Sequence, residues 1–302
     1  MAETPPAGIP CDLCGAETRY AFTTTDRNRA LSSRRFTYDR CVRCGTYALR
    51  DVPLDLDVYY PPEYYGPEDR AVLERAAASP IEQGKLGLIG PYASGGALLE
   101  IGPGGGQFAL AASNAGFSVT SIEMDGGACE RLERLVGVPA IHSGEPEVVL
   151  AGLAPSDVIA MWHVLEHLPR PRMALEAAAR NLRPGGVLAL AVPNPQSLQF
   201  RLLRGRWAHV DAPRHLFLLP LRAVSGAVAE HGLELASATT ADAAGRHWNR
   251  FGWEYALRRF PARRPSSRVS RTLAGVIDQA LSPVERRGLT GTTYSAVFIK
   301  RR

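Results

Sequence analysis

Residues 91 to 240 alternate short apolar runs with longer amphipathic ones, and this pattern constrains the fold most strongly. The short runs predict strands, and the final apolar run of the chain adds a seventh: residues 97–102, 117–123, 139–143, 157–161, 187–194, 234–240 and 292–300. Helices are expected at residues 67–78, 107–116, 126–135, 172–182, 221–233 and 269–281. This alternation predicts an α/β fold with a mostly parallel sheet covered by helices on both faces.

A glycine-rich loop, "LEIGPGGGQF", lies between the first of these strands and its helix. Gly102, Gly104 and Gly106 allow sharp turns and let the backbone approach a ligand closely. A dinucleotide-binding loop would have its third glycine at position 107, where this chain has Gln107. The spacing is instead acid-x-G-x-G-x-G, and Glu100 is the acid.

Glu123 ends the second expected strand, shortly after the glycine loop. A carboxylate at this place accepts hydrogen bonds from ribose hydroxyls in nucleotide-binding α/β folds. The loop and the carboxylate together predict a site for a nucleoside-bearing cofactor.

Four segments then carry a resemblance to a known family: "EIGPGGG", "SIEMD", "DVIAMWHVLEHLPRP" and "LRPGGVLALAVPNP". From about residue 91 to 240 the chain resembles class I S-adenosylmethionine (SAM)-dependent methyltransferases. The resemblance implies a Rossmann-like sheet of seven strands, in which strand seven is antiparallel and lies between strands five and six. The terminal run "TTYSAVFIK" would be that strand.

The resemblance also implies which residues bind SAM. The methionine part would be held by Glu100 with Gly102, Gly104 and Gly106, and the ribose by Glu123. Met124 would flank the adenine, and Glu145 would contact its amine. The cofactor would be bordered by Trp162 and His163.

His163, Glu166 and His167 form the pattern H-x-x-E-H, which is also the signature of inverted zinc proteases. That protease site needs a sustained helix, and Pro169 and Pro171 bar one here. We therefore reject a hydrolase. On a single helical turn the three side chains would still share one side.

A second polar cluster follows the fifth strand and comprises His209, Asp211, Arg214 and His215. A histidine with a pKa near 7 suits deprotonation of a hydroxyl group. One hypothesis is therefore a general base, either His167 or His215, oriented by Glu166 or Asp211. A purely structural role for Glu166 and His167 stays open.

Part of the resembled family implies a metal instead. Small-RNA 2′-O-methyltransferases and ubiquinone-pathway O-methyltransferases carry E-x-x-E-H after strand four, and the former add a histidine after strand five. Those residues bind a divalent cation. The corresponding residues here would be His163, Glu166, His167 and His215. His163 replaces a glutamate, which disfavours Mg²⁺ and favours a transition metal or no metal.

The N-terminal region holds two C-x-x-C-G knuckles, formed by Cys11, Cys14, Cys41 and Cys44. Four thiolates without an open position suit structural Zn²⁺, and a rubredoxin-type iron centre is the alternative. A module of about 50 residues buries little core, so the metal would supply folding energy. With Cys129 alone, the five cysteines argue against a disulfide framework.

Hydrophobic residues make up 45% and charged residues 22% of the 302 residues, as in ordinary globular proteins. The sequence contains no apolar run of about 18 residues, so no membrane span is expected. The start has no basic cluster followed by an apolar stretch, so no secretion signal is expected. We expect a cytoplasmic protein without a membrane partner. Eight arginines and one acid, Glu254, lie between Arg246 and Arg271. Such a stretch either binds an anionic substrate or forms a solvated surface of an arginine-rich chain.

Three parts are expected: a zinc-binding ribbon (1–50), a helical and aromatic connector (51–90), and a SAM-dependent methyltransferase domain (91–302). An insert at about 241–291 would cover the substrate. Tyr64 and Tyr65 would either close over the cofactor or substrate, or pack the ribbon against the core. The predicted activity is methyl transfer from SAM to a small molecule, such as a sugar, nucleotide-linked or natural-product intermediate. An RNA methyltransferase that grips nucleic acid with the ribbon and the insert, and a non-catalytic SAM-binding protein, are the alternatives. The pattern predicts neither the acceptor atom nor an oligomeric state.

Overall fold

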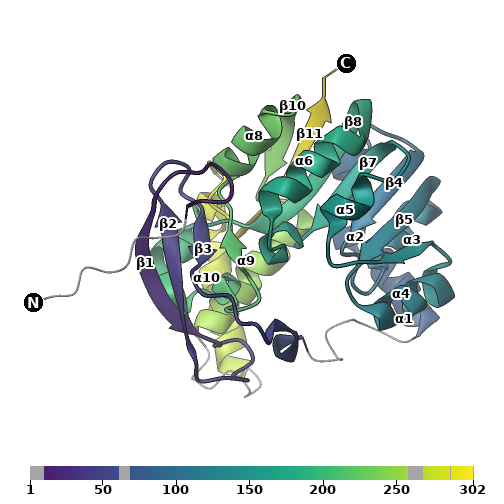
Figure 1. The fold of residues 1–302 in the computed structure, drawn as a ribbon. Helices are drawn as coiled ribbons and strands as arrows, with labels where there is room; N and C mark the ends of the chain where they lie inside the picture. Colours follow the sequence, from purple (N-terminus) through teal and green to yellow (C-terminus); the bar gives the residue numbers. More distant parts are fainter. Residues whose placement is uncertain (1–9, 61–68, 258–267, 286, 302) are drawn as a thin grey trace, which may run out of the picture.

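Two sheets organise the protein (Figure 1). The computed structural model describes residues 10–60, 69–257, 268–285 and 287–301. Tyr64, Tyr65 and the arginines between positions 258 and 264 lie outside these ranges, as does the start of the expected helix at 67–78.

The larger sheet has seven strands in the order β10-β11-β8-β7-β4-β5-β6. They are β4 (Gly96–Ile101), β5 (Phe117–Glu123), β6 (Ala140–His142), β7 (Ser156–Trp162), β8 (Leu182–Pro193), β10 (Leu233–Thr239) and β11 (Thr293–Lys300). All strands except β11 run parallel, because β11 pairs antiparallel with both β8 and β10. The predicted fold class, with its antiparallel strand between the fifth and sixth strands, is therefore confirmed.

Side-chain alternation along β8 explains the two helical layers. Leu188, Leu190 and Val192 pack on one face, whereas Val187 and Ala189 pack on the other. A strand buried on both faces needs a helix layer on each side. Helices α5 (Pro146–Leu150), α6 (Pro171–Asn181) and α8 (Leu221–Ala229) cover the first face. Helices α1 (Arg70–Ala77), α2 (Pro80–Ile89) and α3 (Gln107–Asn114) cover the second.

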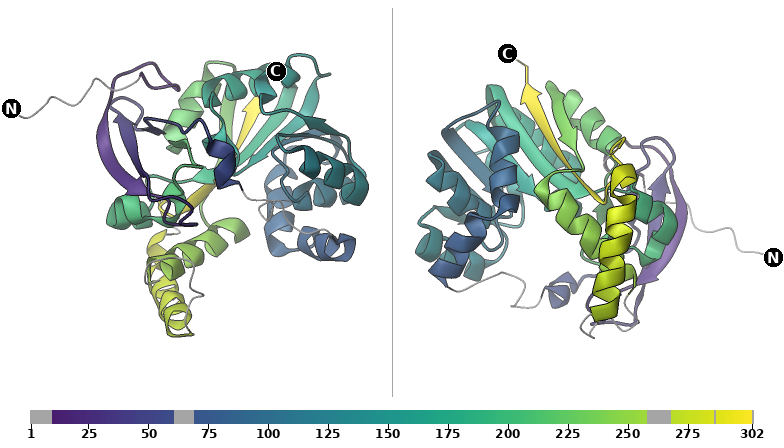
Figure 2. Two further views of the ribbon diagram at one scale, coloured as in Figure 1. Left: turned by 60° about the horizontal axis from the view of Figure 1, so that its bottom comes forward. Right: turned by 180° about the vertical axis from the view of Figure 1, so that it is seen from behind.

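The remaining helices are α4 (Gly126–Arg131), α7 (Leu198–Leu203), α9 (Ala243–Ala256) and α10 (Arg268–Glu285). Helices α9 and α10 pack against each other and are seen from behind in Figure 2. They occupy the insert between β10 and β11. The patterns missed α2, α5, α7 and α9, and placed the start of β8 five residues late, because its first residues form the irregular run Arg183–Gly186. No helix in the described ranges is both long and apolar enough to cross a bilayer.

The smaller sheet contains the N-terminal ribbon. Its order is β1-β2-β3-β9, with β1 (Thr18–Thr25), β2 (Arg35–Cys41), β3 (Tyr47–Leu49) and β9 (Phe217–Leu218). Strand β9 follows β8 of the large sheet in the chain and pairs with β3. Residues of the ribbon and of the large sheet's first face also share one apolar core. The ribbon is thus built onto the rest of the protein (Figure 1).

The four predicted cysteines converge at one end of the ribbon. Sulfur atoms of Cys11 and Cys44 lie 3.5 Å apart, those of Cys14 and Cys41 lie 3.4 Å apart, and all four fall within 4.8 Å of one another. Zn–S bonds of about 2.3 Å would put tetrahedral sulfurs about 3.8 Å apart, so the set fits zinc. Each knuckle closes on a left-handed glycine, at φ 69° and φ 79°, as the tight turn requires.

Candidate active site

A cavity of about 620 Å³ opens at the carboxyl ends of the parallel strands. The first strand of the sheet, β4, lies between β5 and β7. The strands that follow β4 in the chain are therefore added first on one side of it, as β5 and β6, and then on the other side, from β7 onward. Ligands of doubly wound sheets bind at such a switch point. The lining comes from the ends of β4, β5, β6 and β7, with additions from the connector, α2 and α9.

Glu123, at the end of β5, lies on one wall of this cavity. Its carboxylate accepts hydrogen bonds from the amides of Gly104, Met124 and Asp125, at 3.2, 2.7 and 3.1 Å. Burial raises the pKa of this carboxyl, although these amides partly offset the shift. The amides hold Glu123 at the switch point, where a nucleoside ligand would reach it.

Glu100, at the end of β4, lines the same cavity and is 2% exposed. Burial raises its pKa to about 8, and one of its oxygens has no hydrogen-bond partner. Lys85 of α2 also lines the cavity; its ammonium lies over the rings of Phe108 and Trp162 and 2.8 Å from Glu82. A buried acid and a cation thus lie together at the glycine-loop end.

The three predicted glycines have different surroundings. All have left-handed φ values, of 66°, 53° and 80°. Gly102 and Gly104 line the cavity, and a methyl group on Gly104 would meet no protein atom within 4 Å. Gly106 does not line it: a Cβ there would lie 2.7 Å from Leu132 and 2.9 Å from Val136. Gly106 therefore allows helix packing, and Gly102 allows the close approach of Val164, which would lie 2.5 Å from a Cβ there. Gly104 has open space beside it and leaves room for a ligand.

Of the other residues predicted to contact the cofactor, three line the cavity and one does not. Met124, Trp162 and His163 line the cavity. Glu145 does not; its side chain is exposed and forms an ion pair with Arg170. Its neighbours Ser143, Gly144 and Pro146 take the place at the wall.

The two predicted polar clusters meet beside the cavity. Ligand atoms of Glu166, His167 and His215 lie within 4.8 Å of one another, and the two imidazole rings are 4.6 Å apart. His167 lines the cavity. The turn that carries Glu166 and His167 is a short 3₁₀ turn, Leu165–His167, consistent with the rejection of the protease helix.

Backbone carbonyls determine which ring nitrogen of His167 and of His215 carries the proton. His167 Nδ1 lies 3.0 Å from the carbonyl oxygen of Arg214, and His215 Nδ1 lies 2.8 Å from that of His209. Because a carbonyl only accepts, both Nδ1 atoms carry the proton and both Nε2 atoms have a free lone pair. The Tyr60 hydroxyl is 2.9 Å from His167 Nδ1. Burial lowers the pKa of His167 to about 4, so its ring is neutral at pH 7.

Glu166 is fully buried, and neither carboxylate oxygen has a hydrogen-bond partner. Burial raises its pKa, although His167 and His215 lower it. His163 Nδ1 is 3.5 Å from this carboxylate, but His163 does not belong to the set of three converging ligand atoms. An uncompensated buried carboxylate is costly, so this cluster suits a bound proton or cation.

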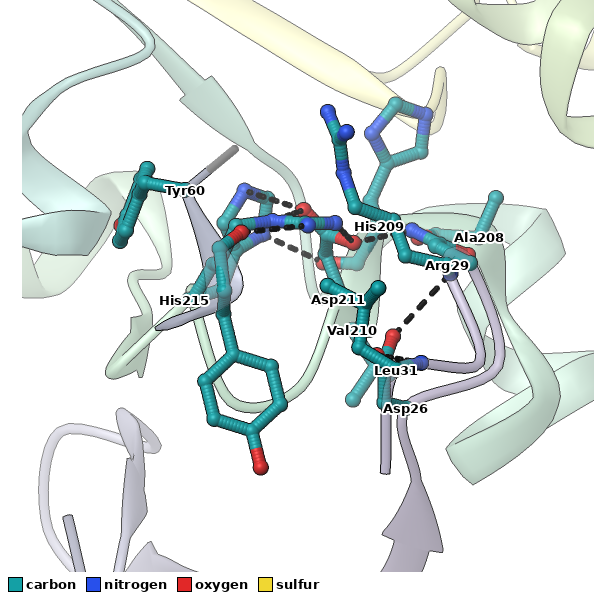
Figure 3. Close-up of polar contacts among 12 residues, drawn as sticks. Asp26, Arg29, Leu31, Tyr60, Ala208, His209, Val210, Asp211 and His215 are labelled. Atoms are coloured by element: carbon teal, nitrogen blue, oxygen red, sulfur yellow. Dashed lines mark hydrogen bonds and ion pairs between the residues drawn. The ribbon is translucent and has the colours of Figure 1, made fainter. Parts of the chain in front are cut away.

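Asp211 forms an ion pair with Arg214 and lies beside His215 of the cluster, where Figure 3 labels both Asp211 and His215. Burial would raise the pKa of Asp211, but the Arg214 guanidinium outweighs it and lowers the value to about 2. Arg214 also donates to the Tyr59 carbonyl. Asp211 Oδ2 lies 3.8 Å from His215 Nε2. The aspartate is therefore a permanent negative charge beside the histidines.

The lining residues that the sequence patterns did not assign to the site include Tyr60, Lys85 and Trp248. Trp248, on α9, packs its ring against His163 and His209 at 5.6 and 5.4 Å. It belongs to the aromatic residues interleaved with the insert's arginines, so a signal existed. Lys85 had none, because its helix was not predicted.

Comparison with known proteins gives a consistent result. The family described as "Methyltransferase domain" matches residues 72–238, more than half of the chain. A ubiquinone biosynthesis O-methyltransferase from Alkalilimnicola ehrlichii is 32% identical over 120 residues, 35% of this chain and 46% of that protein. One from Paracidovorax citrulli is 29% identical over 152 residues, 47% of this chain and 60% of that protein. The chain spans about half the length of these curated relatives.

Solved structures are similar as well. A SAM-dependent methyltransferase from Archaeoglobus fulgidus has a TM-score of 0.48 at 17% identity, covering 76% of this chain and 98% of that one. One from Mesorhizobium loti has a TM-score of 0.47 at 14% identity, with 76% and 100% covered. With the family match, the strand order and the cavity at the switch point, the chain belongs to the methyltransferase-domain family, as a class I SAM-dependent methyltransferase with an N-terminal Cys₄ ribbon.

Proposed function

We propose that this protein transfers the methyl group of SAM to a hydroxyl group of a small molecule. The observation that carries the proposal is one cavity in which a nucleoside-type wall, formed by the glycine loop and Glu123, adjoins a buried cluster of neutral histidines. The wall suits the cofactor, and the cluster suits an acceptor that must lose a proton.

The cofactor end can accommodate each part of SAM. The Glu123 carboxylate would accept hydrogen bonds from the ribose hydroxyls. The methionine part is a zwitterion, and Glu100 and Lys85 offer it opposite charges on the same wall. Because burial raises the pKa of Glu100 to about 8, an arriving ammonium group would favour its charged form.

The histidine cluster is the proposed place of proton removal. A lone imidazole with a pKa near 4 is a weak base for a hydroxyl group. The same neutral ring, with Nδ1 bound to a carbonyl and Nε2 free, is the usual state of a metal-bound histidine. Together with Glu166, whose carboxylate oxygens have no hydrogen-bond partner, the donors His167 and His215 fit a divalent transition cation. When bound, such a cation would lower the pKa of a nearby hydroxyl.

Oxygen is the proposed acceptor atom, since both curated relatives above are named O-methyltransferases. The cluster lies beside the cavity and next to His163, whose ring packs against Trp248. The insert at about 241–291 would cover the acceptor, because α9 supplies Trp248 to the wall. Its arginines would favour an acceptor that carries phosphate or carboxylate.

The test is a transfer assay with methyl-labelled SAM and a panel of acceptors: catechols, other phenols, sugars, and their phosphorylated or carboxylated forms. We expect labelled O-methyl product from at least one hydroxyl-bearing acceptor, detected by mass spectrometry. Matched acceptors with the hydroxyl replaced by hydrogen should give none. Transfer to carbon or nitrogen alone would contradict the assignment to oxygen, and no transfer to any acceptor would contradict the activity.

A further inference from the structure

The Cys₄ ribbon contacts the histidine cluster directly. The Tyr38 hydroxyl, on β2, donates to the carbonyl oxygen of His215 at 2.6 Å and is fully buried. The next residue, Leu216, is held by β3, because the Leu49 amide donates to the Leu216 carbonyl at 2.8 Å. The Leu216 amide in turn donates to the carbonyl of Glu166 at 2.8 Å. A continuous path of hydrogen bonds therefore joins the ribbon to two members of the cluster.

The turn after β1 makes a second connection, drawn in Figure 3. Asp26 accepts hydrogen bonds from the amides of Arg29 and Leu31, at 3.1 and 2.9 Å, and so closes this turn. Asn28 lies within it and donates to the Asp211 carboxylate and to the Ala208 carbonyl. The ribbon thereby holds the aspartate that faces His215.

The cysteine knuckles make a third connection. In the first knuckle, the Asp12 carboxylate accepts a hydrogen bond from the amide of Arg172 at 3.0 Å, in the first turn of α6. Helix α6 begins just after the turn that carries Glu166 and His167. In the second knuckle, the Cys44 carbonyl accepts from Arg222 of α8 at 2.9 Å. A metal that fixes both knuckles would also fix these two helices.

We propose that the metal-loaded ribbon is a positioning element of the active site: Tyr38, Asn28 and Asp12 hold His215, Asp211 and the Glu166–His167 turn in place. Outer partners of this kind typically change activity by about 10- to 100-fold when they are removed. The ribbon itself contributes no described residue between 10 and 50 to the lining of the cofactor cavity. Loss of these contacts should therefore disturb the cluster and leave SAM binding intact.

Two substitutions separate positioning from simple stabilisation. Tyr38→Phe deletes the hydroxyl that donates to His215. Thr24→Val deletes a ribbon hydroxyl that donates to the carbonyl of Gly205, also at 2.6 Å, outside the histidine cluster. Both are buried ribbon-to-core hydrogen bonds, so both variants should lose similar stability.

The first measurement needs no turnover. Protein labelled with ¹⁵N-histidine reports the tautomer of each ring, and His215 is expected in the Nδ1–H form. Its signal, assigned with a His215→Gln variant, should shift in Tyr38→Phe and stay in place in Thr24→Val. An unchanged His215 signal in Tyr38→Phe, or the same change in both variants, would overturn the proposal.

The second measurement rests on the proposed function. With SAM and an active acceptor, kcat should fall about tenfold in Tyr38→Phe and less than about twofold in Thr24→Val. The Kd for SAM should be unchanged in both. Equal losses of kcat in the two variants would overturn the positioning role. An inactive wild-type protein would instead refute the proposed function, and the histidine spectra would still decide this inference.

Discussion

The two ends of the active site are built in different ways. The cofactor end is formed largely by consecutive elements: β4, the glycine loop and the end of β5. The histidine end collects Tyr60, His167, His215 and the ribbon's Tyr38 from separate parts of the chain. Short-range geometry secures the first end, whereas long-range contacts secure the second. Damage to distant parts of the protein should therefore affect the histidine end selectively.

Loss of the ribbon's metal should have the largest effect. Structural zinc contributes about 10–16 kcal/mol of apparent binding energy, comparable with the whole stability of a domain. We expect Cys41→Ser to lose the metal and to reduce kcat by more than about 100-fold. Metal content by mass spectrometry and turnover would be measured together.

Cys129→Ser is the matched control, because Cys129 is a buried cysteine outside the set of four. It should keep the metal and most of the activity. A metal-free Cys41→Ser protein with normal kcat would show that the two ends do not differ in their dependence on the ribbon.

Glu166→Gln should have the next largest effect. The substitution keeps the shape of a fully buried side chain and removes its charge. We expect kcat to fall about 100-fold, because the proposed cation site loses its carboxylate charge, while the Kd for SAM stays within about twofold. Steady-state kinetics would measure the change in kcat, and calorimetry would measure the Kd for SAM. Equal weakening of SAM binding would contradict the separation of the two ends.

The glycine loop allows a finer test within the cofactor end. Alanine at either position 104 or position 106 must adopt a left-handed φ, at a cost of about 1–2 kcal/mol. Gly106→Ala should lower the free energy of unfolding by a further ~1–3 kcal/mol, because its methyl group meets Leu132 and Val136. Gly104→Ala should instead weaken SAM binding about tenfold. Thermal unfolding would measure the stability of both variants, and calorimetry would measure their affinity for SAM. A larger loss of stability in Gly104→Ala, or a larger loss of SAM affinity in Gly106→Ala, would contradict the roles assigned to the two glycines.

The smallest effect concerns the pH dependence of stability. The folded-state pKa of Glu100 is about 8, above the ordinary 4.5, because of burial. Between these values the folded protein holds a proton that the unfolded chain has lost, so this group lowers stability as pH rises from 4.5 to 8. Denaturant unfolding of the SAM-free protein should show this fall relative to Glu100→Gln; parallel pH curves would refute it.

The same contrast explains what the sequence could predict. Each strand of the large sheet shows a short apolar run, and Glu100, Gly102 and Glu123 stand beside those runs. Their positions follow from the strand that carries them, so the cavity's cofactor wall was predictable. The cysteine set was equally clear, because its spacing is characteristic by itself.

The histidine end was only partly predictable. Both polar clusters were found, and Glu166, His167 and His215 converge as proposed. The local pattern included His163, which instead packs against Trp248. The contacts of Tyr38 and Asn28 span more than a hundred residues, and no local periodicity encodes such pairs. Glu145 lies outside the cavity lining, at the surface beside Arg170.

The most direct test of the account is a calorimetric titration of SAM into the wild-type protein and a Glu123→Gln variant. The account predicts one binding site in the wild type, and a Kd raised about 10- to 100-fold in the variant, since a charged acceptor of ribose hydroxyls is lost. Equal affinity in the two proteins would contradict the central assignment, and so would the absence of binding heat in the wild type across temperatures.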